Sequence, residues 1–177
     1  IAYNPQQNQW QVLQENPFSA NCGAALIAEG NKVTLVDGEI KPGLRSTEVK
    51  QFTFQSTKDV VCKLLPSIDG GSGQPEHEGL AGAFSGQING CGFAMGGAYF
   101  IGSQRNLRDG QWYTHQGLTK YYSSDVWRLD GSWKKVAQLP EGAAYGAAVT
   151  TDEGIILIGG EQSQQKALVS CYLMKWI

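Results

Sequence analysis

A pattern of glycines and short apolar runs recurs three times along these 177 residues, and it constrains the fold more than any other feature. In each copy a glycine opens one apolar run, and a second glycine, 14 or 15 residues further on, ends the next run. The glycine pairs are Gly23 and Gly38, Gly82 and Gly97, and Gly146 and Gly160. A short run followed by a proline precedes each pair, and another run follows it. Each copy therefore predicts four short strands, and the series predicts a repeat fold whose units pack against one another.

The three units span approximately residues 10–54, 60–129 and 133–176. Paired glycines after an inner strand, then a later strand and a tryptophan, are typical of Kelch repeats, whose period is about 50 residues. The first and third units have about this length, and insertions lengthen the middle one. We therefore predict an all-β fold, a Kelch-type β-propeller of about three four-stranded antiparallel blades, with residues 1–4 as the outer strand of a preceding blade.

Three blades are fewer than the roughly four to eight of a closed propeller. We therefore interpret residues 1–177 as a partial propeller. An open ring leaves strand edges and apolar blade faces uncovered, which favours association. We expect a closed ring to form either with missing blades or with a second copy of this chain.

Two insertions lengthen the middle unit. Residues 69–78 are rich in glycine, proline and acidic residues and predict a mobile loop in which His77 is solvated. Residues 102–121 predict a loop of a different kind, because loops between strands are where propellers place ligand contacts. This second insertion carries Arg105, Arg108, Trp112, Tyr113, His115, Lys120 and Tyr121.

Charge and composition exclude several classes of partner. The formal net charge is −2 and no basic run is present, so nothing indicates nucleic-acid binding. No stretch approaches the ~20 consecutive apolar residues of a membrane span. No signal peptide is recognised, and because the chain starts at Ile1, any targeting segment is expected to lie outside this sequence.

Cys22, Cys62, Cys91 and Cys171 show no Cys-x-x-Cys spacing and lie in or beside apolar runs. Their even number would permit disulfides, but free Cys behaves as a small hydrophobe, so we expect buried thiols.

Residues 38–45, Gly-Glu-Ile-Lys-Pro-Gly-Leu-Arg, are the strongest candidate for a functional segment. They follow a β-branched run that predicts a strand, and Pro42-Gly43 suits the central positions of a type II turn. Fully extended, Glu39 and Arg45 would lie roughly 20 Å apart at about 3.3 Å per residue, whereas the turn makes them near neighbours. Spacing alone allows two interpretations: a surface salt bridge worth roughly 0–1 kcal/mol, or a carboxylate and a guanidinium that act on a ligand.

Two segments resemble a known family. The motif in residues 38–45, on a Kelch-type repeat, closely resembles one found in the bacterial N-acetylneuraminate epimerases, also called sialic acid mutarotases. Residues 96–103, 113–118 and 122–125 form a second segment that is similar to that family, in a different repeat. The similarity extends through most of the chain and falls in the C-terminal half of these six-bladed propellers. The resemblance therefore implies half of a six-bladed ring.

The resemblance also implies an activity, the interconversion of the α and β anomers of N-acetylneuraminate, with no cofactor, in periplasmic carbohydrate metabolism. Anomerisation removes a proton from the anomeric hydroxyl and delivers one to the ring oxygen, so one carboxyl can act as general base and then as general acid. Glu39 is the candidate for this role. Arg45, the second candidate catalytic residue, is expected to bind the sugar carboxylate bidentately, and Lys41 to add a point charge.

Four more residues are candidates for substrate contacts: Arg105, His115, Tyr145 and Glu161. Glu161 occupies the position in its repeat that Glu39 occupies in the first, and would line the central channel. The family often has an arginine before the tyrosine at position 145, whereas this chain has Ala144 and departs from the family there.

Other functions remain open from the sequence. A non-catalytic Kelch module that binds a sugar or a protein would look similar outside residues 38–45, and an inactive structural fragment is a third interpretation. No Gly-x-Ser-x-Gly elbow supports a serine hydrolase. The only histidines, His77 and His115, lack the pattern of a metal site, which also argues against the Kelch-type copper oxidases.

Overall fold

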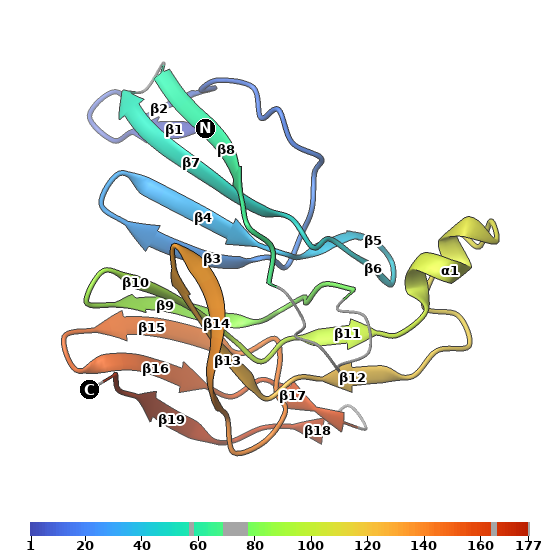
Figure 1. Cartoon of the computed structure of the whole chain (residues 1–177). Helices are drawn as coiled ribbons and strands as arrows, with labels where there is room; N and C mark the ends of the chain where they lie inside the picture. Colours follow the sequence, from blue (N-terminus) through green and yellow to red (C-terminus); the bar gives the residue numbers. More distant parts are fainter. Residues whose placement is uncertain (57–58, 69–77, 164–165, 177) are drawn as a thin grey trace.

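The computed structural model describes residues 1–56, 59–68, 78–163 and 166–176. Within these ranges three antiparallel sheets, here called blades A, B and C, lie one beside the next in chain order (Figure 1). Blade A consists of β3 (Ala25–Glu29), β4 (Lys32–Val36), β7 (Val49–Ser56) and β8 (Asp59–Leu65). Blade B consists of β9 (Phe84–Ile88), β10 (Cys91–Met95), β13 (Asp125–Asp130) and β14 (Ser132–Gln138). Blade C consists of β15 (Ala147–Thr151), β16 (Gly154–Ile158) and β19 (Cys171–Met174).

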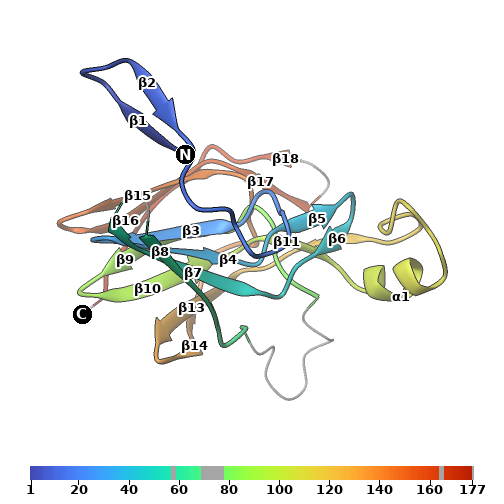
Figure 2. The same ribbon diagram turned by 90° about the horizontal axis from the view of Figure 1, so that it is seen from above.

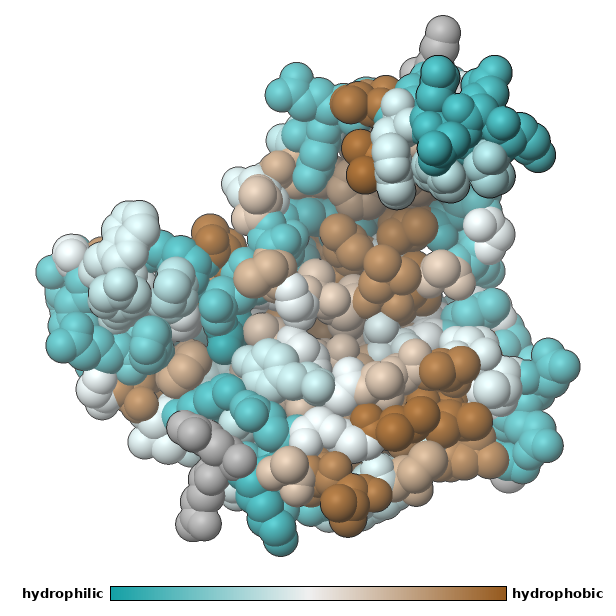
Figure 3. All heavy atoms as spheres, turned by 180° about the vertical axis from the view of Figure 1, so that it is seen from behind, coloured by the Kyte–Doolittle hydropathy of each residue, from teal (hydrophilic) through white to brown (hydrophobic). Residues whose placement is uncertain are grey.

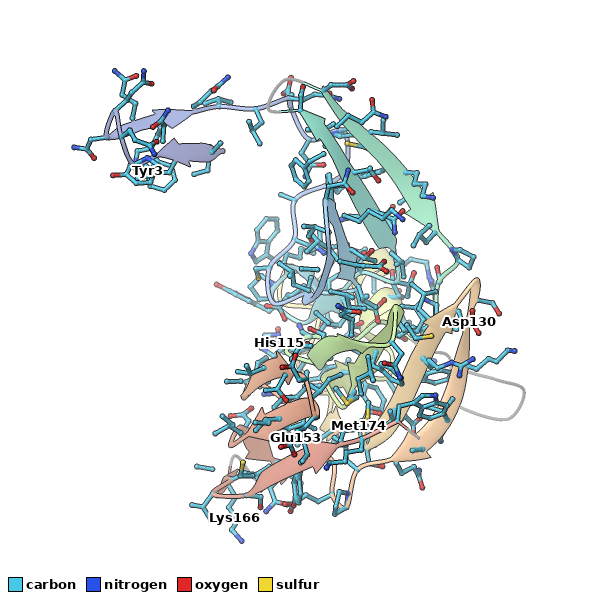
Figure 4. The ribbon with its side chains drawn as sticks, turned by 90° about the vertical axis from the view of Figure 1, so that its left-hand side faces the viewer. Tyr3, His115, Asp130, Glu153, Lys166 and Met174 are labelled. Carbon is cyan, nitrogen blue, oxygen red and sulfur yellow. The ribbon has the colours of Figure 1, made fainter. Side chains whose placement is uncertain are left out.

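Each blade carries a two-stranded extension between its second and third strands, and the extensions lie at the same end of the blades (Figure 1). They are β5 (Glu39–Lys41) with β6 (Leu44–Arg45), β11 (Ala98–Phe100) with β12 (Lys120–Tyr122), and β17 (Glu161–Gln162) with β18 (Lys166–Ala167). A short helix, α1 (Ser103–Arg108), lies between β11 and β12. A separate hairpin of β1 (Ala2–Asn4) and β2 (Gln9–Gln11) projects away from the blades, as Figures 2 and 4 show.

Small residues set the turns and the spacing of the blades. Asn89 and Gly90, with φ of 52° and 75°, form the tight connection between β9 and β10 that a twisted hairpin requires. A Cβ added to Gly86 would lie 2.7 Å from the Thr150 hydroxyl oxygen and 2.9 Å from the Ile155 side chain, so the lack of a side chain at Gly86 lets blade C pack closely on blade B here.

The hydrophobic core lies between the blades. One cluster joins blades A and B and contains Ala25, Ile27, Val36, Val49, Ile68, Ala94, Trp127 and Trp133. A second joins blades B and C and contains Phe84, Phe93, Met95, Val126, Ala143, Ile155 and Leu157. Because burying each large aliphatic or aromatic side chain contributes about 1.5–3 kcal/mol, these contacts fix how one blade sits on the next.

The predicted all-β architecture of antiparallel blades is confirmed, with two differences in detail. Blade C has three strands within the described residues rather than four. The strand at residues 60–65, assigned to the start of the second unit, is the outer strand of blade A, because β8 pairs with β7 along its length. In the same way β14 closes blade B. A strand that directly follows another pairs with it as a hairpin, so the sequence units and the blades are out of phase by one strand.

The expectation that the cysteine thiols are buried was wrong. All four cysteines are free, but Cys22 and Cys171 are exposed, and Cys62 and Cys91 are only partly buried. Cys91, one of the two partly buried residues, packs against the second core cluster.

The two insertions also differ from the expectation. Residues 102–121 contain α1 and most of β12 rather than loop alone. Most of the loop expected at residues 69–78, including His77, lies outside the described residues. Glu78, its last residue, is 7% exposed and accepts hydrogen bonds from the backbone N–H of Gly102 and the hydroxyl of Ser103, so it anchors the start of α1.

The surface has uncovered apolar side chains, as expected for an open ring. Leu26 of β3, Val149 of β15 and Leu173 of β19 are each about half exposed, and Figure 3 shows apolar groups collected on the face seen from behind. None of the helices in the described ranges has the length and apolar character needed to span a bilayer.

Candidate functional site

The hairpin of β5 and β6 brings together the two residues that the sequence singled out. Gly43 has φ of 85°, as the predicted turn requires, and Glu39 lies directly opposite Arg45 in the ladder. Side chains at directly opposite positions share one face of a hairpin, so the Glu39 carboxylate and the Arg45 guanidinium form an ion pair. The expected proximity of the two side chains is confirmed.

The environment of Arg45 differs from the surface salt bridge that was one interpretation. The residue is 2% exposed. Its Nε donates to the carbonyl of Ala98 in blade B at 3.2 Å, and its Nη2 donates to the Tyr145 hydroxyl in blade C at 3.3 Å. The guanidinium also lies 5.3 Å from the centre of the Phe100 ring. One side chain of blade A therefore contacts all three blades.

The charge of Arg45 is maintained in this buried position. Burial lowers the pKa of the guanidinium from its usual value, and the Tyr145 hydroxyl opposes that shift. Because arginine keeps its proton under any ordinary condition, the site retains a fixed positive charge beside Glu39. Glu39 itself is 27% exposed at its side chain, so solvent reaches the carboxylate but hardly the guanidinium.

Tyr145 has a backbone conformation that is costly for its type. Its φ is 62°, and it stands where blades A and B have Gly23 and Gly82, with φ of 60° and 64°. The sequence pattern had aligned Gly146 with these two glycines, which is wrong by one residue. The three residues form a chain of backbone hydrogen bonds, in which Gly82 donates to Gly23 and Tyr145 donates to Gly82, both at 2.7 Å. A bulky residue in this region costs about 1–3 kcal/mol and is typical of functional positions. Tyr145 is 44% exposed.

A second carboxylate lies at the equivalent point of blade C. Isolated bridges pair Cys22 with Glu39, Ala81 with Ala98, and Ala144 with Glu161, so positions 39, 98 and 161 correspond. Glu161 Oε1 accepts hydrogen bonds from Lys120 Nζ at 2.5 Å and Tyr122 Oη at 2.6 Å, both from β12 of blade B. These two hydrogen bonds lower the pKa of Glu161, which keeps it ionised.

Two other predicted site residues lie at the first hairpin: Lys41 is the last residue of β5, and His115 follows Thr114 in the insertion that packs on the turn. The backbone N–H and the hydroxyl of Thr114 both donate to the carbonyl of Pro42 at 3.2 Å, which docks the insertion on the turn. The His115 ring lies 5.6 Å from that of Phe100. Its Nδ1 is buried and has no hydrogen-bond partner within the described residues. Lys41 Nζ lies 4.8 Å from the centre of the exposed Trp112 ring.

Arg105 is not brought into this cluster. It is exposed on α1, and its side chain makes no hydrogen bond or ion pair within the part of the chain that the structure describes.

Lys120 and Tyr122 are the residues that sequence reasoning passed over as site members. These two residues could have been found by aligning β12 with β6, because both are the second strand of an extension. The long insertion before β12 obscures that alignment in the sequence. In the described residues no three His, Cys, Asp or Glu side chains gather as a metal-ligand set. The side chains at this end of the blades include two carboxylates, Glu39 and Glu161, three cations, Lys41, Arg45 and Lys120, and the phenols of Tyr122 and Tyr145.

The blade architecture defines this protein as a Kelch-type β-propeller, with a cluster of acid, base and phenol groups at the blade ends. A family model described as N-acetylneuraminate epimerase matches residues 1–177, and the chain belongs to that family. The family resemblance drawn from the two motif segments is thus confirmed.

Named relatives agree with this assignment. The chain is 42% identical over 177 residues to an N-acetylneuraminate epimerase of Vibrio cholerae, a match that covers 99% of this chain and 46% of that protein. It is 39% identical over 180 residues to an N-acetylneuraminate epimerase of Brucella melitensis, covering 99% of this chain and 46% of that protein. The solved structure of YjhT superposes with a TM-score of 0.87 and 33% identity over 98% of this chain and 48% of that chain. The chain thus spans about half the length of the relatives it matches.

Proposed function

We propose that this chain forms half of a sialic acid mutarotase, an isomerase that interconverts the α and β anomers of N-acetylneuraminate. The observation that carries the proposal is the solvent-accessible Glu39 carboxylate held against the buried Arg45 guanidinium, in a chain of the N-acetylneuraminate epimerase family. The names of the relatives support the substrate.

Glu39 is the proton-transferring group in this proposal. It takes the proton of the anomeric hydroxyl and returns one to the ring oxygen, which breaks the ring C–O bond and forms the open-chain keto acid. Reclosure on the other face of the carbonyl runs the same transfers backwards, so no net proton or electron is consumed.

Arg45 orients Glu39 and supplies the positive charge beside which the sugar carboxylate docks. Its 2% exposure means that a direct bidentate contact with the sugar requires Glu39 or Tyr145 to move aside. Lys41 and Lys120 are more accessible cations at the same end of the blades.

The active assembly in this proposal is a closed ring, made by this chain with further blades or with a second copy. The half-length match to the relatives and the uncovered apolar side chains support it. A periplasmic location and a place in carbohydrate metabolism follow from the resemblance alone.

The activity is tested by NMR on the closed assembly. The α anomer is released from a glycoside, growth of the β signal is followed, and the spontaneous rate is subtracted. We expect Glu39→Gln to slow the catalysed rate by about 10²–10⁴-fold with sugar binding largely retained. Glu153→Gln is the matched control, because Glu153 is another ion-paired glutamate on the exposed surface of blade C, paired with Lys175 at 3.4 Å.

If the wild-type assembly equilibrates the anomers no faster than buffer, the isomerase proposal fails and the sugar-binding or protein-binding module takes its place. If wild type is active and Glu39→Gln matches it, Glu39 is the wrong residue.

A further inference from the structure

Lys120, Tyr122 and Glu161 form a second polar cluster that the proposed proton transfer does not use. Lys120 and Tyr122 are two residues apart on β12, so their side chains share one face of the strand. Both donate to Oε1 of Glu161, and no hydrogen bond from a described residue reaches Oε2. The side chains of Lys120 and Glu161 are 31% and 30% exposed, so the cluster is open to a ligand.

The second cluster resembles the first site in how a side chain crosses to the next blade. Arg45 pairs with position 39 in blade A and reaches the Ala98 carbonyl of blade B. Tyr122 pairs with Ala98 in blade B and reaches the Glu161 carboxylate of blade C. In both cases a side chain from the second strand of an extension reaches the first residue of the next extension.

Tyr145 joins the two clusters. Its hydroxyl accepts from Arg45 at 3.3 Å, and its ring centre lies 4.5 Å from Lys120 Nζ. One phenol ring and two short contacts therefore separate the two cations. A single monosaccharide is large enough to contact both clusters at once.

The charge of the second cluster favours neutral hydroxyl groups over a second anion. The ionised Glu161 would repel a carboxylate, and the Lys120 charge is already balanced by it. A hydroxyl both donates and accepts, which matches a carboxylate oxygen beside an ammonium and a phenol. The half-exposed Tyr145 ring supplies an apolar wall for the C–H groups of such a ligand.

We propose that Lys120, Tyr122 and Glu161 form a subsite that binds the exocyclic polyol chain of the acidic sugar whose anomeric end lies at Glu39 and Arg45. This inference rests on the proposed function. It assigns to the second cluster the recognition of vicinal hydroxyl groups, with Tyr145 as the wall between the two ends of the ligand.

The test is a binding cycle by calorimetry on the closed assembly, with two ligands and two proteins. The ligands are N-acetylneuraminate and an analogue whose polyol chain has been shortened by periodate cleavage and reduction. Hydrogen bonds to charged groups predict that wild type binds the shortened sugar about 10- to 100-fold more weakly. Glu161→Gln should bind the intact sugar about tenfold more weakly than wild type does. Its affinities for the intact and the shortened sugar should differ by less than about threefold.

Tyr122→Phe keeps the ring on β12 and removes only the hydroxyl, so it tests the same cycle if Glu161→Gln folds poorly. Glu153→Gln, away from β12 on blade C, is the matched control and should retain the full penalty for shortening. An equal penalty for shortening in wild type, Glu161→Gln and Tyr122→Phe overturns the subsite while leaving the proposed function intact. A wild-type assembly that binds neither sugar overturns the proposed function and the subsite with it.

Discussion

Replacing Arg45 tests whether one buried guanidinium holds the blade ends together. Arg45→Met keeps most of the apolar volume and removes the ion pair with Glu39, the bond to the Ala98 carbonyl and the bond to the Tyr145 hydroxyl. Truncating one partner of a fully buried charge pair costs about 3–5 kcal/mol, because the other partner is left uncompensated.

Some partners of Arg45 keep or gain another hydrogen bond when Arg45 is replaced, and this reduces the expected loss in the free energy of unfolding. The Ala98 carbonyl also accepts from Ala81 N–H at 3.0 Å, and the Glu39 carboxylate and Tyr145 hydroxyl are accessible enough to gain water. We therefore expect Arg45→Met to lower the free energy of unfolding by about 2–3 kcal/mol. Arg45→Lys should lower the free energy of unfolding by less, because lysine keeps the charge, although it lacks the planar guanidinium that makes several hydrogen bonds at once.

The assay is urea unfolding of the protein at fixed concentration, with Arg128→Met as the matched control. Arg128 pairs with Asp130 at 2.6 Å and lies 5.1 Å from the Trp176 ring, but Asp130 is 58% exposed at its side chain. The Arg128 side chain is only 20% exposed, but solvent reaches the Asp130 carboxylate, so losing this pair should lower the free energy of unfolding by only ~0–1 kcal/mol. Arg45 does not hold the blade ends together if Arg45→Met lowers the free energy of unfolding no more than Arg128→Met does, or by the same amount when Glu39 is already glutamine.

Two further outcomes are expected. Gly43→Ala should lower the free energy of unfolding by about 1–3 kcal/mol and speed amide exchange at residues 113–118, because φ at Gly43 is 85° and the new Cβ would overlap the His115 backbone. Unchanged amide exchange would contradict the packing of the insertion on this turn. The stability lost in Glu161→Gln should depend on pH. The pKa of Glu161 is lowered mainly by its hydrogen bonds to Lys120 and Tyr122, so its contribution is present above the ordinary glutamate pKa of about 4.3 and is lost as pH falls through the lower folded value. Unfolding at pH 7 and pH 3 checks this, and an equal difference at both pH values would contradict it.

The sequence was sufficient to predict the strands and the contacts that form within a single hairpin. The glycine spacing predicted the antiparallel blades, and the Pro42-Gly43 turn predicted that Glu39 would meet Arg45, because that contact needs only one hairpin. The six residues of α1 were missed because they are too few to show helical periodicity. The phase of the blades was misassigned because repeat spacing alone does not say which neighbour a strand pairs with.

What the sequence could not supply is the contact between blades. Tyr145 lies 100 residues from Arg45, and Glu161 lies 41 residues from Lys120, so both contacts depend on how the packed cores set one blade on the next. No local sequence pattern encodes how one blade is oriented on the next. The burial of Arg45 has the same origin, since it follows from contacts with Ala98 and Tyr145 rather than from its own hairpin.

Equivalent positions of the three blades can be compared to find residues that the fold itself does not require. Positions 39, 98 and 161 have the same backbone bridge in each blade, yet they carry glutamate, alanine and glutamate. The left-handed position carries glycine twice and then Tyr145, where only glycine is free of strain. Glycine satisfies the fold at this position in the first two copies, so the strained Tyr145 of the third copy is not something that the fold itself requires. Tyr145 and the two glutamates, Glu39 and Glu161, lie at one end of the blades and are joined through Arg45 and Lys120, which is why we place the chemistry there rather than elsewhere on the blades.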